Sequence, residues 1–520
     1  MRTVRTDCLV IGSGLAGASY AYHAAKTGLQ CILISGESSP DECNSVRAQG
    51  GIVDPSVDPK TLCSDIMVAS SNAANPHAIN FIVDRGRTAV RELVDELDVP
   101  FERDGNGALR MTREAAHSTA RILYAKDQTG EAILTALHSA VSASPRIEVV
   151  VNTVAIDLLT LSHSSTDRLH KYEPLTCFGA YALDVATNEV YVILAHKTVL
   201  ATGGLGQIYQ HSTNFPNAYG HGVAMGYRVG GRVIVMEYVQ FHPTVFSKKG
   251  SPPFLISEAL RGEGGHLVDS SGRHFMNDHH PDGSLAPRDV IARSITFEMI
   301  RTGAPSVFID LGDLKPSYVT ERFPTIYRHC LDQGVDITCQ LIPVVPAAHY
   351  SCGGLHTDLY GKTNIANLLA VGETACTGFH GANRLASTSL LECVTMAREA
   401  AISAASEITG SQFNPPEVRP WEGNRLQADE DLIQQDLNLI KATMWNYVGL
   451  VRTGRRLQRA RDMLRELHMQ VDDFYRDYAV SKPLLNLRNA VQTALLVVYA
   501  AYHNTTSVGC HYRNDSREGG

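Results

Sequence analysis

A glycine-rich turn at residues 12–17 constrains the fold of this chain more than any other part of its sequence. The turn reads GSGLAG and lies between an apolar run that predicts a strand and an alanine-rich run that predicts a helix. In this setting Gly12 makes a tight turn, Gly14 lets the backbone approach a pyrophosphate, and Gly17 allows close helix packing. A second predicted strand at residues 31–35 follows at βαβ spacing. The sequence therefore predicts an α/β fold that begins with a Rossmann-like dinucleotide-binding domain.

The segments after this unit bear on which dinucleotide is bound. The acidic residue usually expected at the end of the second strand is missing, since Ser35 and Gly36 stand there and Glu37 is nearby but out of register. Three more glycine-bearing segments occur later: RAQGG at 47–51, ATGG at 201–204 and VGE at 371–373. Each could be an ordinary loop by itself. Together they favour a long dinucleotide threaded across the sheet edge, and hence FAD over NAD.

Length and shifts in composition predict several domains. A chain of 520 residues is too long for one compact core. Residues 237–350 are rich in Pro, Gly and polar residues, which indicates an inserted α+β capping domain of mixed structure rather than more sheet. Near the C-terminus, apolar residues at helical spacing predict a helical bundle. The expected divisions are residues 1–236 and 351–415 for the FAD-binding domain, 237–350 for the capping domain and 416–520 for the helical domain.

Three finer features are predicted in the second half of the chain. Residues 382–405 are expected to form a long helix, and the proline-rich stretch at 410–423 is expected to be a linker. The segment after Gly509 is expected to be a frayed tail.

Charge and composition argue against several other classes of protein. A net charge of -8 and a pI near 6.2 do not fit a nucleic-acid binder. No run approaches the roughly 18 apolar residues of a membrane-spanning helix, and the N-terminal segment lacks a secretory cleavage site. A cytosolic protein with no membrane partner is therefore expected. Eleven cysteines without a C-x-x-C pair predict reduced thiols, and no metal site is predicted.

A series of short motifs resembles those of one flavoprotein family. The motifs span about Arg5 to Gly509 and read GSGLAG, AQGG, LATGG, QFHPT, LRGEGG, APRD, AAHYSCGG, VGE and ANRLASTSLLE. They resemble the family that contains the flavoprotein subunits of fumarate reductase and succinate dehydrogenase and, more closely, the L-aspartate oxidases. Respiratory members carry a His that bonds covalently to the flavin a few residues before AQGG, whereas Asn44 occupies that place here. The resemblance therefore implies non-covalently bound FAD.

The glycine loops and the resemblance together predict the residues that contact FAD. These are Gly12, Ser13, Gly14, Leu15, Ala16, Gly17, Ser35, Gly36, Asn44, Ser45, Val46, Arg47, Ala48, Gln49, Gly50, Gly51, Thr202, Gly203, Gly204, His221, Glu373, Ser389 and Leu390. Two of them depart from the family pattern. Gly36 replaces a Lys often found beside the ribose, and His221 stands where a GDG motif normally has Asp.

A dicarboxylate substrate needs several cationic or hydrogen-bonding groups in one pocket, because two carboxylates cannot be buried unpaired. The candidates are His242, Ser257, Arg288, His349 and Arg384, although each could instead be a structural His or a surface ion pair. The resemblance implies that Arg288 transfers a proton and that the other four hold the carboxylates. Because a guanidinium is a poor base, Arg288 could instead only stabilise charge while the substrate amine enters deprotonated. The sequence leaves both roles open.

Glu114 bears on whether the substrate carries an amino group. It matches a T-R-E-x-x-H-S pattern of L-aspartate oxidases, where a carboxylate would pair with the α-ammonium; the structural alternative is a helix cap or a surface residue. The resemblance then implies oxidation of L-aspartate to iminoaspartate, with oxygen, giving hydrogen peroxide, or fumarate as electron acceptor. It also implies the first step of de novo NAD biosynthesis, with quinolinate synthase taking up the imine. The alternatives are a soluble fumarate reductase and a non-catalytic flavin-binding protein.

Overall fold

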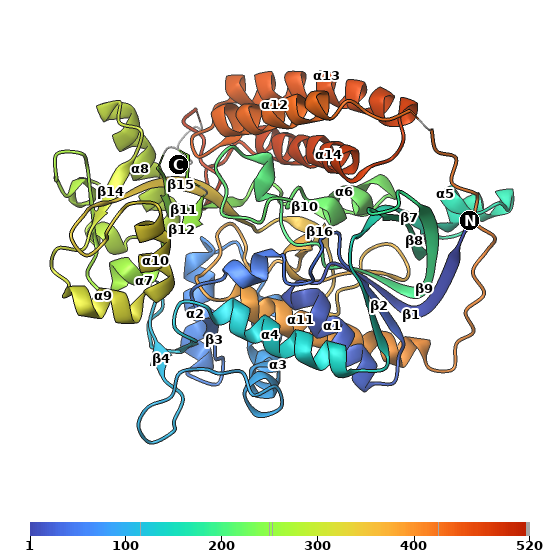
Figure 1. Ribbon diagram of the computed structural model, residues 1–520, viewed down its shortest axis with the longest axis horizontal. Helices are drawn as coiled ribbons and strands as arrows, with labels where there is room; N and C mark the ends of the chain where they lie inside the picture. The colour runs from blue at the N-terminus through green and yellow to red at the C-terminus, as the bar shows by residue number, and fades with distance from the viewer. Residues whose placement is uncertain (115, 249, 252, 425, 516–520) are drawn as a thin grey trace.

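A seven-stranded sheet forms the centre of the dinucleotide-binding part of the chain (Figure 1). The computed structural model describes residues 1–114, 116–248, 250–251, 253–424 and 426–515. The strands, in sheet order, are β6 (Ile147–Val150), β2 (Cys31–Ile34), β1 (Thr3–Ile11), β9 (Val190–Leu200), β8 (Cys177–Asp184) and β7 (Thr153–Thr160), with β17 (Leu368–Ala370) beside β9. Strands β2, β1, β9 and β17 are parallel, so their carboxyl ends meet at one edge. This confirms the predicted Rossmann-like fold and places the glycine loops together at that edge.

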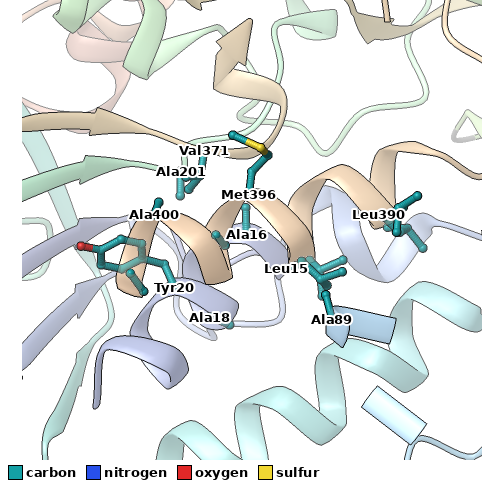
Figure 2. Close-up of a cluster of buried hydrophobic side chains, with 14 of the residues drawn as sticks. Leu15, Ala16, Ala18, Tyr20, Ala89, Ala201, Val371, Leu390, Met396 and Ala400 are labelled. Atoms are coloured by element: carbon teal, nitrogen blue, oxygen red, sulfur yellow. The ribbon is translucent and has the colours of Figure 1, made fainter. Parts of the chain in front are cut away.

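Helices cover this sheet in layers and bring the loop before α11 to the same edge. Helices α1 (Leu15–Lys26) and α4 (Thr129–Ala143) contact the strands, α11 (Ser389–Ile408) packs against α1, α3 (Pro76–Asp95) against α11, and α2 (Pro59–Ala69) against α3. Figure 2 shows Ala16, Met396 and Ala400 among the buried side chains where α1 and α11 meet. The prediction of a helix from residue 382 is wrong at its start, because Ser387 has a φ of 58° and residues 382–388 form a loop.

The inserted segment folds as helices around a second, separate sheet, which confirms the predicted α+β character of the inserted domain. All strand pairs are antiparallel, in the order β12 (Phe254–Leu255), β11 (Val239–Phe246), β15 (Ile342–Ser351), β14 (Val307–Asp310) and β13 (His266–Val268). The helices are α7 (Glu258–Gly262), α8 (Arg288–Thr302), α9 (Pro316–Arg322) and α10 (Pro324–Asp332). Pro243 lies inside β11, where the pairing with β15 shifts register between His242 and Val245. Such prolines mask the alternating pattern by which a strand is recognised.

Three long helices form the C-terminal part, as predicted, and pack along one side of the molecule in Figure 1. They are α12 (Glu430–Val448), α13 (Gly454–Asp477) and α14 (Lys482–His503). By length and composition alone α14 could cross a membrane, but 67% of its apolar window is buried within the fold, which is typical of a core helix. The remaining elements are α5 (Leu161–Ser164), α6 (His221–Arg228), β3 (Ile52–Val53), β4 (Met111–Thr112), β5 (Ile122–Leu123), β10 (Val233–Ile234), β16 (Gly354–His356) and β18 (Ala375–Cys376).

The C-terminal tail is ordered by buried contacts, so the prediction of a frayed tail is wrong for residues 510–515. The guanidinium of Arg452 is fully buried and lies 2.6 Å from Nδ1 of His511. The backbone N–H of Cys510 donates a hydrogen bond to the carbonyl of Ala382 at 3.0 Å. The tail thereby packs against the loop that precedes α11. Residues 516–520 lie outside the described residues.

We expect Arg452→Leu to lower the free energy of unfolding by about 3 kcal/mol or more, because it leaves several buried acceptors without their donor. These acceptors include the carbonyls of Val448, Gly449 and Glu237. Urea denaturation measures the loss, and trypsin cleavage after Arg513 reports release of the tail. The exposed Arg455→Leu serves as the control and should change stability by less than about 0.5 kcal/mol. Equal losses of unfolding free energy in the two variants would contradict the role of Arg452 in holding the C-terminal tail.

Candidate active site

Two adjoining cavities lie at the carboxyl edge of the central sheet. The first, which we call the cofactor cavity, has a volume of about 1170 Å³ and follows the GSGLAG turn and the end of β2. The second, the substrate cavity, has a volume of about 990 Å³ and lies between residues 44–51 and the inserted domain. The two share the lining residues Asn44, Ser45, Glu373 and Cys393. They therefore adjoin, and together they are lined by residues of the FAD-binding and inserted parts.

Most of the residues predicted to contact FAD line these cavities; the exceptions are Gly17, Val46 and Gly204. A Cβ on Gly17 would lie 1.9 Å from the carbonyl oxygen of Gly12, so this glycine serves helix packing, as its position in the motif predicts. A Cβ on Gly204 would lie 2.1 Å from Oε1 of Glu373, which makes room for that carboxylate. Val46 packs against the hydrophobic core.

The residues present fit a dinucleotide. Helix α1 has no side-chain cap from Gly14 and no acidic residue in its first turn. The N–H of Leu15 donates to Oγ of Ser45 at 2.9 Å, so the N–H groups of Ala16 and Gly17 are the ones that face a pyrophosphate. A Cβ on Gly14 would lie 3.3 Å from Oγ of Ser45, a tight contact that the absence of a side chain at Gly14 avoids. In the substrate cavity, Oε1 of Gln49 is buried without a hydrogen-bond partner and needs a donor.

His221 lines the cofactor cavity with both ring nitrogens engaged. Nε2 lies 2.9 Å from the carbonyl oxygen of Asn217, and Nδ1 lies 2.9 Å from Nδ2 of Asn489 on α14. Burial lowers the pKa of His221 to about 4, so the ring is neutral. The departure from the family pattern at this position is thus accommodated by a contact with the C-terminal helices.

All six residues predicted to act on the substrate line the substrate cavity: Glu114, His242, Ser257, Arg288, His349 and Arg384. They come from distant parts of the fold. The histidines lie on the paired strands β11 and β15, Ser257 caps α7, Arg288 begins α8, and Arg384 lies in the loop before α11. The structure therefore brings together groups that the sequence spreads over 271 positions, from 114 to 384.

Arg288 belongs to a buried ion-pair cluster. Its Nε donates to Oε1 of Glu258 at 2.6 Å, and its Nη1 donates to Oε1 of Gln240 at 3.1 Å. Nη2 of Arg261 also donates to Oε1 of Glu258, at 3.2 Å. Burial opposes charge on Glu258, but Arg288 and Arg261 outweigh it and lower the pKa of this carboxyl to about 2. Burial likewise opposes charge on Arg288, yet Glu258 raises the pKa of Arg288, which keeps it protonated.

The two histidines form a neutral, hydrogen-bonding wall. Their ring centroids lie 5.1 Å apart, edge to face. Burial, with nearby arginines for His242 and with His242 itself for His349, holds both pKa values well below the usual range. Nδ1 of His242 contacts the backbone of Thr244 at 3.2 Å, and Nδ1 of His349 lies 2.8 Å from Oγ1 of Thr213. This leaves Nε2 of each ring for a ligand.

Arg384 carries a buried positive charge without a bonded carboxylate among the described residues. Its guanidinium lies 4.6 Å from the centre of the Tyr350 ring, and Nη1 donates to Oγ of Ser389 at 3.3 Å. Nε is buried and has no hydrogen-bond partner. Burial, followed by repulsion from Arg288, lowers the pKa of Arg384. A buried cation in this state favours an anionic ligand.

Glu114 is the one carboxylate lining the described substrate cavity that is bonded neither to an arginine nor to a backbone N–H. Oγ of Ser387 donates to its Oε2 at 2.7 Å. By contrast, Glu258 is paired with arginines, and Glu373 accepts a bond from the N–H of Ser351 at 2.8 Å. Burial raises the pKa of Glu114, which a cationic partner would reverse. The cavity thus offers two strong cations and one unpaired anion.

Comparison with known proteins places this geometry in a family. Models described as FAD binding domain and as fumarate reductase flavoprotein C-term match residues 7–390 and 438–519. The chain is 42% identical to L-aspartate oxidase 1 of Ralstonia nicotianae over 519 residues, which is 98% of this chain and 95% of that protein. The chain belongs to the L-aspartate oxidase family. The matched domain also identifies FAD as the bound dinucleotide.

Other relatives agree with this membership. The L-aspartate oxidase of Pseudomonas aeruginosa is 40% identical, over 98% of this chain and 95% of that protein. A solved chain of E. coli quinol fumarate reductase superposes with a TM-score of 0.87 at 26% identity, covering 99% of this chain and 92% of that chain. The fold and the inserted domain are therefore shared with a fumarate-reducing enzyme.

Sequence analysis missed part of the site. Glu258, Arg261, Gln240 and Ser387 hold the predicted residues in place but were not predicted themselves. Glu258 and Arg261 have the i, i+3 spacing of a helical ion pair, a signal that could have indicated their pairing. Ser387 gave no such signal, because its contact with Glu114 depends on the loop conformation.

Glu373 should make the stability of the FAD-free protein depend on pH. Burial raises its pKa to about 7, with Ser351 and Arg384 opposing this and Glu392 adding to it. In the unfolded chain the pKa of this carboxyl is about 4.3. Between about pH 4.3 and about pH 7 the folded state therefore keeps a proton that the unfolded state has lost. The contribution is full below about pH 4.3 and is lost as pH rises through about 7.

The free energy of unfolding should therefore fall between about pH 5 and about pH 8. We expect this fall to be smaller by about 2 kcal/mol in Glu373→Gln than in the wild type. Urea denaturation of both proteins without FAD at the two pH values measures it. An unchanged drop would mean that Glu373 is ionised in the fold throughout this range.

Proposed function

We propose that this protein oxidises L-aspartate to iminoaspartate, with oxygen, giving hydrogen peroxide, or fumarate as electron acceptor. One observation carries the proposal: an unpaired carboxylate, Glu114, lines the same cavity as the cations Arg288 and Arg384. L-Aspartate has two carboxylates and one ammonium, so its charges complement this set. Succinate has no positive group to pair with Glu114.

The side chains of the cavity orient the substrate in this proposal. Arg384, which lacks a bonded carboxylate of its own, pairs with one substrate carboxylate. Nε2 of His242 and of His349, with the hydroxyl of Ser257, hold the other. Glu114 pairs with the α-ammonium and so orients the single hydrogen on Cα toward the cofactor. Bound FAD supplies the acceptor for the hydrogen and electron pair that leave Cα.

Arg288 acts by charge rather than as a base. Its pairing with Glu258 favours the protonated guanidinium, which cannot take up the proton of the substrate amine. The positive charge instead favours loss of the ammonium proton from the bound substrate to Glu114. Of the two roles that the sequence leaves open, the charge-stabilising one is better supported.

FAD is bound without a covalent link in this proposal. Asn44, which stands where respiratory relatives carry the flavin-bonded His, lines both cavities and accepts a hydrogen bond from the N–H of Phe215 at 2.5 Å. An amide is not a nucleophile at ordinary pH. Acid precipitation of the protein should therefore leave the flavin in the supernatant.

The product places the reaction within a sequence of steps. Iminoaspartate hydrolyses in water, so a second enzyme must consume it quickly. We propose that this enzyme is quinolinate synthase and that the reaction is the first step of de novo NAD biosynthesis.

Peroxide formation tests the activity. The purified protein with its flavin is given L-aspartate, D-aspartate, L-glutamate or succinate, and peroxide is measured for each. Selective turnover of L-aspartate supports the proposal. Turnover of succinate alone, or fumarate reduction without any oxidation of L-aspartate, would replace it with a fumarate reductase.

A further inference from the structure

The far end of the cofactor cavity is lined by residues of the C-terminal helix α14. Lys482, Leu485, Asn486 and Asn489 all reach the space beyond β2. In a Rossmann fold the end of the second strand lies beside the ribose of the adenosine half of the dinucleotide. The helical domain therefore contributes to a part of the site that such folds normally build from the strand itself.

A side chain at Gly36 would collide with a neighbouring strand. A Cβ there would lie 2.6 Å from Cγ1 of Val154, so a larger residue at this position would have to displace Val154. The ammonium of Lys482 fills the gap from the other side of the cavity. Its Nζ donates to the carbonyl of Gly36 at 2.7 Å and to Oε2 of Glu37 at 2.9 Å.

Glu37 does not serve as the usual free acceptor for ribose hydroxyls. Its Oε1 accepts a bond from Nδ2 of Asn217 at 2.7 Å, while Oε2 is paired with Lys482. Asn486 in turn donates to Oδ1 of Asn217 at 3.3 Å. Glu37 thus anchors Lys482, and residues of α14 line this end of the cavity together with Glu37.

We propose that Lys482 and Asn486 complete the adenylate half of the FAD site. An ammonium has three N–H donors, and two of those of Lys482 are used within the protein. The third donates to an oxygen of the adenosine ribose or its phosphate. The inference rests on FAD binding and adds that the C-terminal helices are part of the cofactor site, so that FAD binding and docking of α14 stabilise each other.

The test measures binding to the full-length chain stripped of FAD, using FAD, ADP and riboflavin as separate probes. We expect Lys482→Met to raise the dissociation constants of FAD and ADP about tenfold or more, as for the loss of a charged hydrogen bond. Riboflavin, which lacks the adenylate, should change by less than about twofold. The matched control is Lys197→Met, because Lys197 also donates to a carboxylate, that of Glu407, and to a second group, Asn367, away from the cofactor cavity.

Each outcome bears on the proposal. Selective weakening of FAD and ADP in Lys482→Met, but not in Lys197→Met, supports it. Equal weakening of ADP and riboflavin, equal effects of the two variants, or no weakening at all would overturn it. None of these readouts uses aspartate, so a wild-type protein that binds ADP through Lys482 but does not oxidise aspartate would overturn only the proposed function.

Discussion

Glu114→Gln should lower kcat/KM for L-aspartate by about a hundredfold while changing fumarate reduction by less than about threefold. This corresponds to about 3 kcal/mol of lost transition-state stabilisation. The figure is the low end for breaking a buried charge pair, because Glu114 is half-buried. The glutamine keeps the shape of the side chain and can still accept the hydrogen bond from Ser387. It removes only the charge that an ammonium would require. Fumarate has no ammonium, so its reduction should depend little on this residue.

Steady-state rates with L-aspartate and with fumarate, measured on the same preparations, test this prediction. Ser387→Ala is the graded control, because it removes the hydroxyl that orients Glu114 but keeps the charge. It should lower aspartate oxidation by about tenfold, the low end for one hydrogen bond to a charged group. Equal loss of both reactions in Glu114→Gln would exclude Glu114 from ammonium recognition.

The sequence predicted those parts of the site whose signals are local. The GSGLAG turn is recognisable because strand, turn and helix are adjacent in the chain, and the structure places them as the motif requires. Lys482 and Glu37 are 445 positions apart, and no pattern in either segment indicates that they meet. The sequence therefore suggested that the acidic ribose contact was missing, but not what replaces it.

The errors in the fold have the same cause. The inserted α+β domain was predicted, but its strands β11 and β15 were not, because their prolines interrupt the strand pattern. The segment after residue 509 looks polar and disordered, yet the buried Arg452, far away in sequence, supplies a partner for His511. Each error occurred where a long-range contact overrides a weak local preference.

Arg384→Gln should abolish most turnover without destabilising the fold. Arg384 has no bonded carboxylate in the described chain, so its charge costs folding free energy that a bound carboxylate would offset. Removing it should lower kcat/KM by about a thousandfold for both L-aspartate and fumarate, corresponding to about 4 kcal/mol for a buried charge pair. The midpoint of thermal unfolding without ligand should stay the same or rise.

The matched comparison is Arg288→Gln, which also removes a cation from the substrate cavity. Because Arg288 is paired, its loss leaves Glu258 with Arg261 as its remaining bonded partner, so the midpoint should fall as well as the activity. Stabilisation by added succinate gives a readout independent of turnover and should be lost in Arg384→Gln. Arg384 would be a structural residue if Arg384→Gln lowered the midpoint as much as Arg288→Gln and was still stabilised by succinate. The substrate carboxylate that Arg384 is proposed to hold would then be bound by other residues.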